Sequence, residues 1–142
     1  MARLHEYQGK ALLANMGITV PEGGPAASET EAEHIAAELG RPVVVKMQAW
    51  TTKRADQGGI KVADDPAAAK KAAAEMLGRR VGQFTVERVL VEEKLFIKNE
   101  YYAAVIVDDA ARKQLVLFAT GGGTGIEDRA ATGELRLART HA

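Results

Sequence analysis

The sequence predicts an α+β domain, with a mixed sheet, flanking helices and a later β-hairpin. Three observations predict this class. Helix-like segments with capping residues alternate with short apolar runs typical of strands. Two such runs adjoin across a polar turn, and 142 residues suit one average domain or two small ones that share a core. The chain contains no Walker A sequence, and no G-x-G-x-x-G motif follows the first strand. The predicted architecture is therefore not a doubly wound Rossmann unit.

The first part of the chain predicts a helix, an extended segment and a second helix. Residues 4–17, "LHEYQGKALLANMG", suit a short helix that ends at a glycine. Residues 18–27 are extended and are interrupted by prolines and glycines. Ser28 and Glu31 form a capping box for the next helix, and Gly40 ends that helix.

The middle of the chain predicts two strands joined by a loop, and then a helix. Residues 42–49, "PVVVKMQA", read as a buried strand, and residues 58–64, "GGIKVAD", read as a more exposed one. Asp65 is a suitable N-cap, Pro66 suits the first helical position, and Gly78 ends this helix.

The last part of the chain predicts only strands. Residues 87–95, "ERVLVEEKL", form one strand, and residues 99–120 form a β-hairpin whose polar turn lies at 108–113. Three glycines follow at 121–123, and the remaining residues have no strong periodicity.

The composition excludes several classes of function. The formal net charge is zero and the pI is about 6.8, so no global field attracts nucleic acid or an anionic membrane. The absence of cysteine excludes disulfides and thiolate metal sites. His5, His34 and His141 are too scattered to predict a metal site, and no nucleophile–base pair is evident. The N-terminus resembles neither a signal peptide nor a membrane anchor, so we expect a cytoplasmic protein with no membrane partner.

Lys46 is the candidate functional residue that the pattern singles out. It follows three valines at the end of a predicted strand, and the loop after it carries Lys53 and Arg54. Burying an ammonium group is costly, so this lysine either reaches water, as an edge lysine of an ordinary sheet would, or binds an anion. Two strands joined by a loop can close over a polyphosphate, and backbone N–H groups and cations neutralise its charge there.

Several segments resemble the start of the β subunit of succinyl-CoA synthetase. They are "LHEYQGKALLANMGITVPEG", "PVVVKMQA", "GGIKVADDP", "VLVEEKL" and "EYYAAVIVD". Malate–CoA ligase and the N-terminal part of ATP citrate lyase belong to the same group. The resemblance implies an ATP-grasp-type N-terminal region over residues 1–127, with the second lobe incomplete. Residues 128–142 are expected to be a tail of uncertain structure, the start of a continuation.

The resemblance also implies which residues bind nucleotide. Lys46 matches a lysine that contacts the ATP phosphates. The family's G-G-R-G loop falls on residues 52–55, so Lys53, Arg54 and Ala55 are phosphate-binding candidates, although only the arginine keeps its identity.

Three further positions match the part of the family site that binds adenosine. Glu92 matches the hinge acid beside the adenine, Leu95 lies in the hinge segment whose backbone meets the base, and Glu100 matches an acid expected to bind the ribose hydroxyls. Strand alternation sends either Glu92 or its neighbour Glu93 inward.

The expected function follows from the same resemblance. A carboxylate, CoA and ATP give acyl-CoA, ADP and phosphate through a phosphohistidine on a partner α subunit, which also carries the CoA site. The family's Mg²⁺ ligands and its CoA-ligase domain lie later in the family chain, so this chain is not expected to be catalytic alone and no catalytic or metal-binding residue is assigned to it.

A second hypothesis remains open. Thr51 and Thr52 stand in or beside positions where the family has glycines, which permit close backbone approach to phosphate. Gly121 and Gly125 also occur where the family has acids. The chain could therefore be a non-catalytic binding or subunit-assembly module with a degenerate nucleotide loop. Nucleic-acid binding is disfavoured by the neutral charge.

Overall fold

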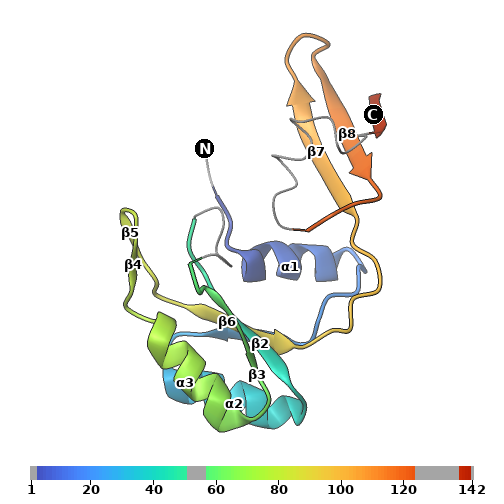
Figure 1. Ribbon diagram of the computed structural model, residues 1–142. Helices are drawn as coiled ribbons and strands as arrows, with labels where there is room; N and C mark the ends of the chain where they lie inside the picture. The colour runs from blue at the N-terminus through green and yellow to red at the C-terminus, as the bar shows by residue number, and fades with distance from the viewer. Residues whose placement is uncertain (1–2, 51–56, 124–137, 142) are drawn as a thin grey trace. The chain divides into compact units, whose positions relative to one another are not determined.

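The computed structural model describes residues 3–50, 57–123 and 138–141, and the chain divides into two compact units, residues 1–95 and 96–142. The α+β class is confirmed (Figure 1). The residues that the structure describes include no helix long and apolar enough to cross a membrane.

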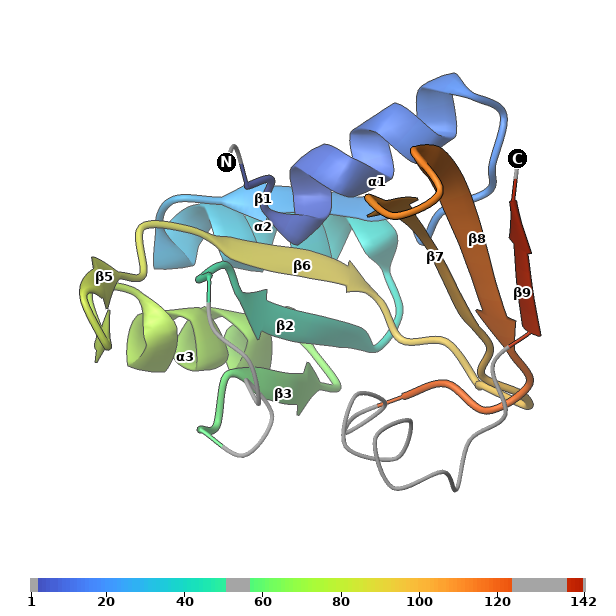
Figure 2. The same ribbon diagram turned by 90° about the horizontal axis from the view of Figure 1, so that it is seen from above.

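The first unit is built on a four-stranded sheet with the strand order β1-β6-β2-β3 (Figure 2). These strands are β1 Gly23–Ala26, β6 Val89–Glu93, β2 Val43–Met47 and β3 Ile60–Ala63. Every described ladder is antiparallel, although a mixed sheet was expected. The described sheet has no parallel pair because β6 lies between β1 and β2. These two strands are joined through a helix and run parallel to each other, but each pairs only with the antiparallel β6 on that side.

Two helices cover one face of this sheet and form the core with it. Helix α2, Glu29–Leu39, packs against β1 and β6, and helix α3, Pro66–Met76, packs against β2 and β3. We call this face of the sheet the core face, and its inward side chains are Val43, Val45, Met47, Val89 and Val91. The helices contribute mainly alanines, which allow a close approach to the sheet.

The predicted helix signals are found in the structure. The Ser28 hydroxyl accepts a hydrogen bond from the Glu31 amide at 3.1 Å, and the Glu31 carboxylate accepts one from the Ala27 amide at 2.7 Å. Gly40 ends α2 in the left-handed conformation. Asp65 caps α3 through the Ala68 amide at 2.7 Å. Because capping depends on neighbours within one turn, the local sequence predicts it well.

Helix α1, Glu6–Asn15, lies across the opposite face of the sheet, above it in Figure 1. We call this the α1 face. Strand alternation assigns to it Val44 and Lys46 from β2 and Leu90 and Glu92 from β6. No residue of α1 is fully buried. No fully buried apolar side chain of α1 therefore anchors the helix to the sheet.

Three strands of the first unit, β1 and two that follow α3, were not predicted as strands. Strands β4, Arg80–Val81, and β5, Phe84–Thr85, form a small hairpin. Strand β1 was expected only to be extended, yet it pairs with β6 along its length. At Gly23, with φ of 141°, an added Cβ would lie 2.1 Å from the Val91 carbonyl oxygen, so this contact requires glycine.

The second unit contains a three-stranded antiparallel sheet with the order β7-β8-β9. The predicted hairpin is present as β7, Tyr102–Asp108, and β8, Lys113–Ala119. The Asp108 carboxylate accepts a hydrogen bond from the Ala111 amide in the turn at 3.0 Å. Strand β9, Ala138–His141, pairs with β8 and was not predicted. Most of the segment expected to be a tail lies outside the described residues.

Candidate functional site

The candidate site centres on Lys46, which lies on an interior strand. Strand β2 pairs with β3 on one side and β6 on the other, so the interpretation of Lys46 as an edge lysine is wrong. Lys46 pairs in register with Leu90, which places it diagonally across from Glu92 on the α1 face. Glu92 is buried, whereas Glu93, on the other face, is half-buried. The ammonium and the buried carboxylate are thus close to each other.

Helix α1 adds a second carboxylate and a second ammonium to this pair. Lys46 Nζ lies 2.5 Å from Glu92 Oε1 and 3.0 Å from Glu6 Oε1. Lys10 Nζ lies 3.3 Å from Glu6 Oε1 and also contacts Glu92 Oε2. We call Glu6, Lys10, Lys46 and Glu92 the charge cluster. It holds two positive and two negative groups, so it is electrically neutral.

Hydrogen bonds of the Gln48 side chain also connect α1 to the end of β2, beside the charge cluster. The side chain of Gln48 is buried, and its Oε1 accepts a hydrogen bond from the Tyr7 amide at 3.4 Å. Its Nε2 donates to the Lys46 carbonyl at 3.3 Å. Gln48 therefore links the first turn of α1 to the backbone of the residue whose ammonium that turn contacts.

The pKa of Lys46 is raised above its ordinary value of 10.5. Desolvation by burial, the largest single influence, lowers it, but the hydrogen bonds and charges of Glu92 and Glu6 together outweigh that effect. Lys46 is therefore a permanent cation at physiological pH. A cation that does not titrate near neutral pH suits the binding of an anion.

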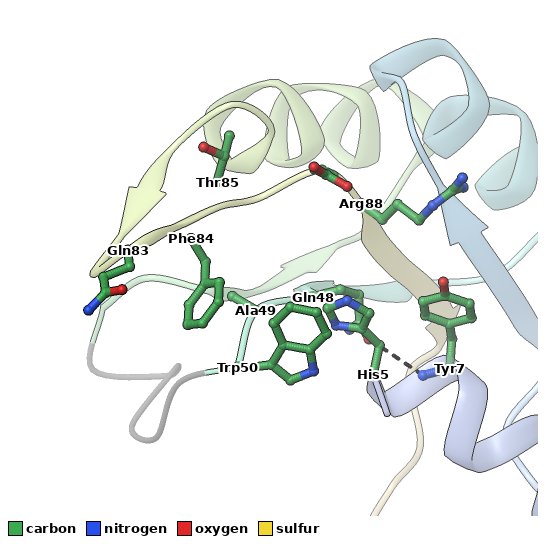
Figure 3. Close-up of a pocket in the computed structure, with 10 residues that line it drawn as sticks. His5, Tyr7, Gln48, Ala49, Trp50, Gln83, Phe84, Thr85 and Arg88 are labelled. Atoms are coloured by element: carbon green, nitrogen blue, oxygen red, sulfur yellow. Dashed lines mark hydrogen bonds between the residues drawn. The ribbon is translucent and has the colours of Figure 1, made fainter. Parts of the chain in front are cut away.

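A cavity of about 440 Å³ adjoins the charge cluster at the Gln48 end (Figure 3). Its wall includes a run of aromatic rings. The rings of His5 and Trp50 are stacked with centroids 4.4 Å apart, and Phe84 of β5 meets Trp50 edge-on at 5.2 Å. Trp50, at 38% exposed, lines this cavity. Charged side chains, Glu87 and Arg88, also line the cavity.

A second cavity, of about 220 Å³, lies beneath α1. It is bordered by Lys10 and Glu92 of the charge cluster, by Leu90, and by the segment before and within β1, namely Val20, Pro21, Gly23, Gly24 and Pro25. Tyr7 borders both cavities. The charge cluster thus has a cavity lined by polar and aromatic side chains near one end, and its other end, at Lys10 and Glu92, borders the second cavity.

The structure brings together only part of the predicted site. Lys46 and Glu92 are in contact, whereas Lys53, Arg54 and Ala55 lie outside the described residues. Leu95 is 51% exposed just after β6.

Glu100 is exposed and belongs to the second unit, where its carbonyl accepts a hydrogen bond from the Gly122 amide at 2.9 Å. The glycines at 122 and 123 therefore lie against Glu100.

Sequence reasoning missed Glu6, Lys10 and Gln48. The spacing of Glu6 and Lys10, four residues apart on a helix, places them on one face and could have marked them as a pair. Nothing in that spacing indicates which strands they contact. Within the described ranges, no group of three or more His, Asp or Glu residues is arranged to hold a metal ion.

Comparisons with known proteins give this geometry a context. A family model described as an ATP-grasp domain matches residues 3–141. The chain is 42% identical over 130 residues to the β subunit of an ADP-forming succinate–CoA ligase of Chloroflexus aurantiacus, covering 92% of this chain and 34% of the relative. It is 42% identical over 128 residues to the β subunit of a GDP-forming succinate–CoA ligase of Thermus thermophilus, covering 90% and 34%. The chain thus spans about a third of the length of these relatives.

Solved structures of related enzymes share the fold. One is the dinucleotide-forming acetyl-coenzyme A synthetase 1 of Korarchaeum cryptofilum, in complex with coenzyme A, Ca-AMPCP and HgCl⁺. It has a TM-score of 0.77 and 26% identity, covering 95% of this chain and 59% of that one. Another is the ATP citrate lyase of Methanothrix soehngenii with citrate and coenzyme A, with a TM-score of 0.71 and 25% identity, covering 98% and 34%. The resemblance inferred from the sequence is confirmed.

Proposed function

The chain belongs to the ATP-grasp family, and from this membership we propose that it is the nucleotide-binding portion of an acyl-CoA synthetase of the succinate–CoA ligase type. The observation that carries the proposal is Lys46. It is a permanently charged lysine, held in place by two carboxylates on an interior strand, at a position that resembles the phosphate-binding lysine of these β subunits. In this role its ammonium donates to a phosphate oxygen of ATP as a compact point charge.

We assign the remaining predicted residues to the two ends of the nucleotide. Lys53, Arg54 and the backbone at Ala55 neutralise phosphate charge, because a loop that presents amides and cations makes an anion site. Glu92, the backbone at Leu95, and Glu100 contact the adenosine. Each oxygen of Glu92 has one lysine partner in the charge cluster, and a carboxylate oxygen has room for a second donor.

The described residues do not fit the magnesium ion that phosphoryl transfer from ATP requires. The two carboxylates of the charge cluster are already neutralised by Lys10 and Lys46, and no other group of three metal-binding side chains is present in the described ranges. Mg²⁺ prefers octahedral oxygen ligands without competing ammonium groups. We therefore expect its protein ligands elsewhere in the β subunit.

The complete enzyme, in this proposal, pairs the β subunit with an α subunit. The α subunit carries the phosphohistidine and the CoA site, and the assembly converts a carboxylate, CoA and ATP to acyl-CoA, ADP and phosphate. This chain contributes nucleotide binding to that reaction and is not catalytic alone.

One observation favours a second function. The family's loop carries glycines where this chain has "TTKRA". Replacing glycines removes the backbone freedom that close contact with phosphate uses. A module that serves only subunit assembly would keep the fold and lose nucleotide affinity. Nucleotide affinity therefore separates the two functions.

The test is calorimetric titration with Mg-ATP of the 142-residue chain and of the complete β subunit, each also as Lys46→Ala. Lys61→Ala is a matched control, because Lys61 lies on a neighbouring strand and pairs with Glu75 at the surface. We expect wild-type binding that Lys46→Ala weakens at least tenfold and Lys61→Ala leaves unchanged. Lack of binding by both wild-type proteins would instead favour the assembly module.

A further inference from the structure

Helix α1 is the element whose role the proposed function leaves unexplained. It has no fully buried residue, yet its first turn delivers Glu6 to Lys46 and its second turn delivers Lys10 to Glu92. All four side chains are mostly buried: Glu6, Lys10 and Lys46 are 21–22% exposed, and Glu92 is 6% exposed. A charged side chain that is mostly buried is stable only when a partner of opposite charge lies in good geometry. The positions of these four side chains therefore constrain one another.

The contacts of Lys46 limit where its ammonium can point. A lysine ammonium has three N–H donors and no acceptor. Glu6 lies 3.0 Å from Nζ and Glu92 lies 2.5 Å from it, and these carboxylates come from two different elements, α1 and β6. With two donors directed at two fixed carboxylates, the direction of the third donor is also fixed. A flexible four-carbon side chain thereby becomes a donor of defined orientation.

We propose that Glu6 is a positioning residue for nucleotide binding: its carboxylate holds the Lys46 ammonium so that the third N–H donor meets a phosphate oxygen. This inference rests on the proposed function, in which Lys46 binds phosphate. Lys10 supports Glu6 from one turn away, at 3.3 Å, and supplies the second positive charge that the two carboxylates require. Gln48 keeps the first turn of α1 over Lys46 through the Tyr7 amide.

The contact between Glu6 and Lys46 also permits the opposite role, in which Glu6 weakens nucleotide binding. The test must distinguish this role from positioning. A carboxylate on Lys46 also competes with an incoming phosphate for the same cation. If competition dominated, removing the charge of Glu6 would tighten nucleotide binding. If positioning dominates, removing it weakens binding, because Lys46 then has only Glu92 to orient it. The sign of the change in affinity therefore decides between the two roles.

The test compares Glu6→Gln, which keeps the shape and removes the charge, with Glu6→Asp, which keeps the charge. Glu75→Gln is the matched control, because it makes the same substitution in the exposed pair with Lys61. Affinities for Mg-ATP are measured by calorimetry in the complete β subunit. We expect Glu6→Gln to weaken binding roughly tenfold, Glu6→Asp to restore part of the loss, and Glu75→Gln to have no effect.

A second ligand, adenosine, distinguishes positioning from damage to the fold. Adenosine has no phosphate, so its affinity, measured by NMR titration, reports only the base and ribose contacts. Positioning through Lys46 leaves adenosine affinity unchanged in Glu6→Gln, whereas displacement of α1 lowers the affinity for both ligands. Unchanged or tighter Mg-ATP binding in Glu6→Gln, or a parallel loss for adenosine, would overturn the role of Glu6 alone. Absence of Mg-ATP binding by the wild-type subunit would overturn the proposed function together with it.

Discussion

The two faces of the central sheet are stabilised in different ways. On the core face, Val43, Val45 and Met47 of β2 are almost fully buried against α2 and α3. On the α1 face, the same strand presents Lys46 to a helix with no fully buried residue. Burial of apolar area gives a large, non-directional stabilisation, whereas a neutral cluster of charges gives little net stability and fixes geometry. The core face therefore provides stability, and the α1 face holds charged side chains in a defined geometry.

The largest expected effect comes from a cavity in the core face. Met47→Ala removes a fully buried side chain and should lower the free energy of unfolding by about 2–5 kcal/mol. Met16→Ala is the matched control, because Met16 follows α1 and is 81% exposed, and it should change stability by less than about 0.5 kcal/mol. Urea unfolding of both variants measures the difference. Equal losses would mean that burial on the core face is not what makes Met47 important for stability.

A smaller effect is expected when the charge cluster is broken. Lys46→Met leaves Glu92 with Lys10 as its remaining partner in the cluster, so we expect a loss of about 2 kcal/mol, below the usual cost of an entirely unpaired buried charge. The double variant Lys46→Met/Glu92→Leu removes one charge of each sign and leaves Glu6 with Lys10. Its stability should return to within about 1 kcal/mol of the wild type while Mg-ATP binding stays lost.

This double variant sharpens the comparison, because it separates stability from function on the same face. If the double variant were as unstable as the single one, the charge cluster would be a source of stability and the two faces would be more alike than we infer. Urea unfolding and calorimetry on the same samples provide both quantities.

The raised pKa of Lys46 predicts where the charge cluster fails. Because the folded-state pKa lies above the ordinary value of 10.5, the contribution of Lys46 to stability is fully present below pH 10.5. It is lost as the pH rises through the raised pKa. The stability difference between the wild type and the Lys46→Met/Glu92→Leu variant should therefore be constant from pH 7 to pH 9 and change only in more alkaline solution. A change near neutral pH would contradict the cause assigned to this shift.

The contrast between the faces also explains what the sequence could and could not predict. The apolar run "VVVKM" predicts a buried strand with a lysine near its end, and the caps of α2 and α3 are local signals. The insertion of β6 between β1 and β2 has no local signal. The contacts from Glu6 to Lys46 and from Lys10 to Glu92 span 40 and 82 residues, so spacing within α1 cannot identify the partners. The residue pattern singles out Lys46 and the resemblance adds Glu92 as a candidate, but only the fold shows that α1 contacts both.

The smallest expected effect concerns the exposed pair of Lys61 and Glu75, which provides a surface reference for the charge cluster. The hydrogen bond and charge of Lys61 hold the pKa of Glu75 below its ordinary value of 4.5. Its contribution to stability is therefore present above pH 4.5 and is lost as the pH falls through the lowered pKa. Because Glu75 lies at the surface, solvent screening keeps this contribution close to the limit of measurement. Glu75→Gln should give a small decrease in melting temperature at pH 7, and that decrease should vanish at pH 2 and in high salt. A decrease as large as that of Lys46→Met would mean that burial does not distinguish the charge cluster from an ordinary surface ion pair, and the comparison of the two kinds of pairing would fail.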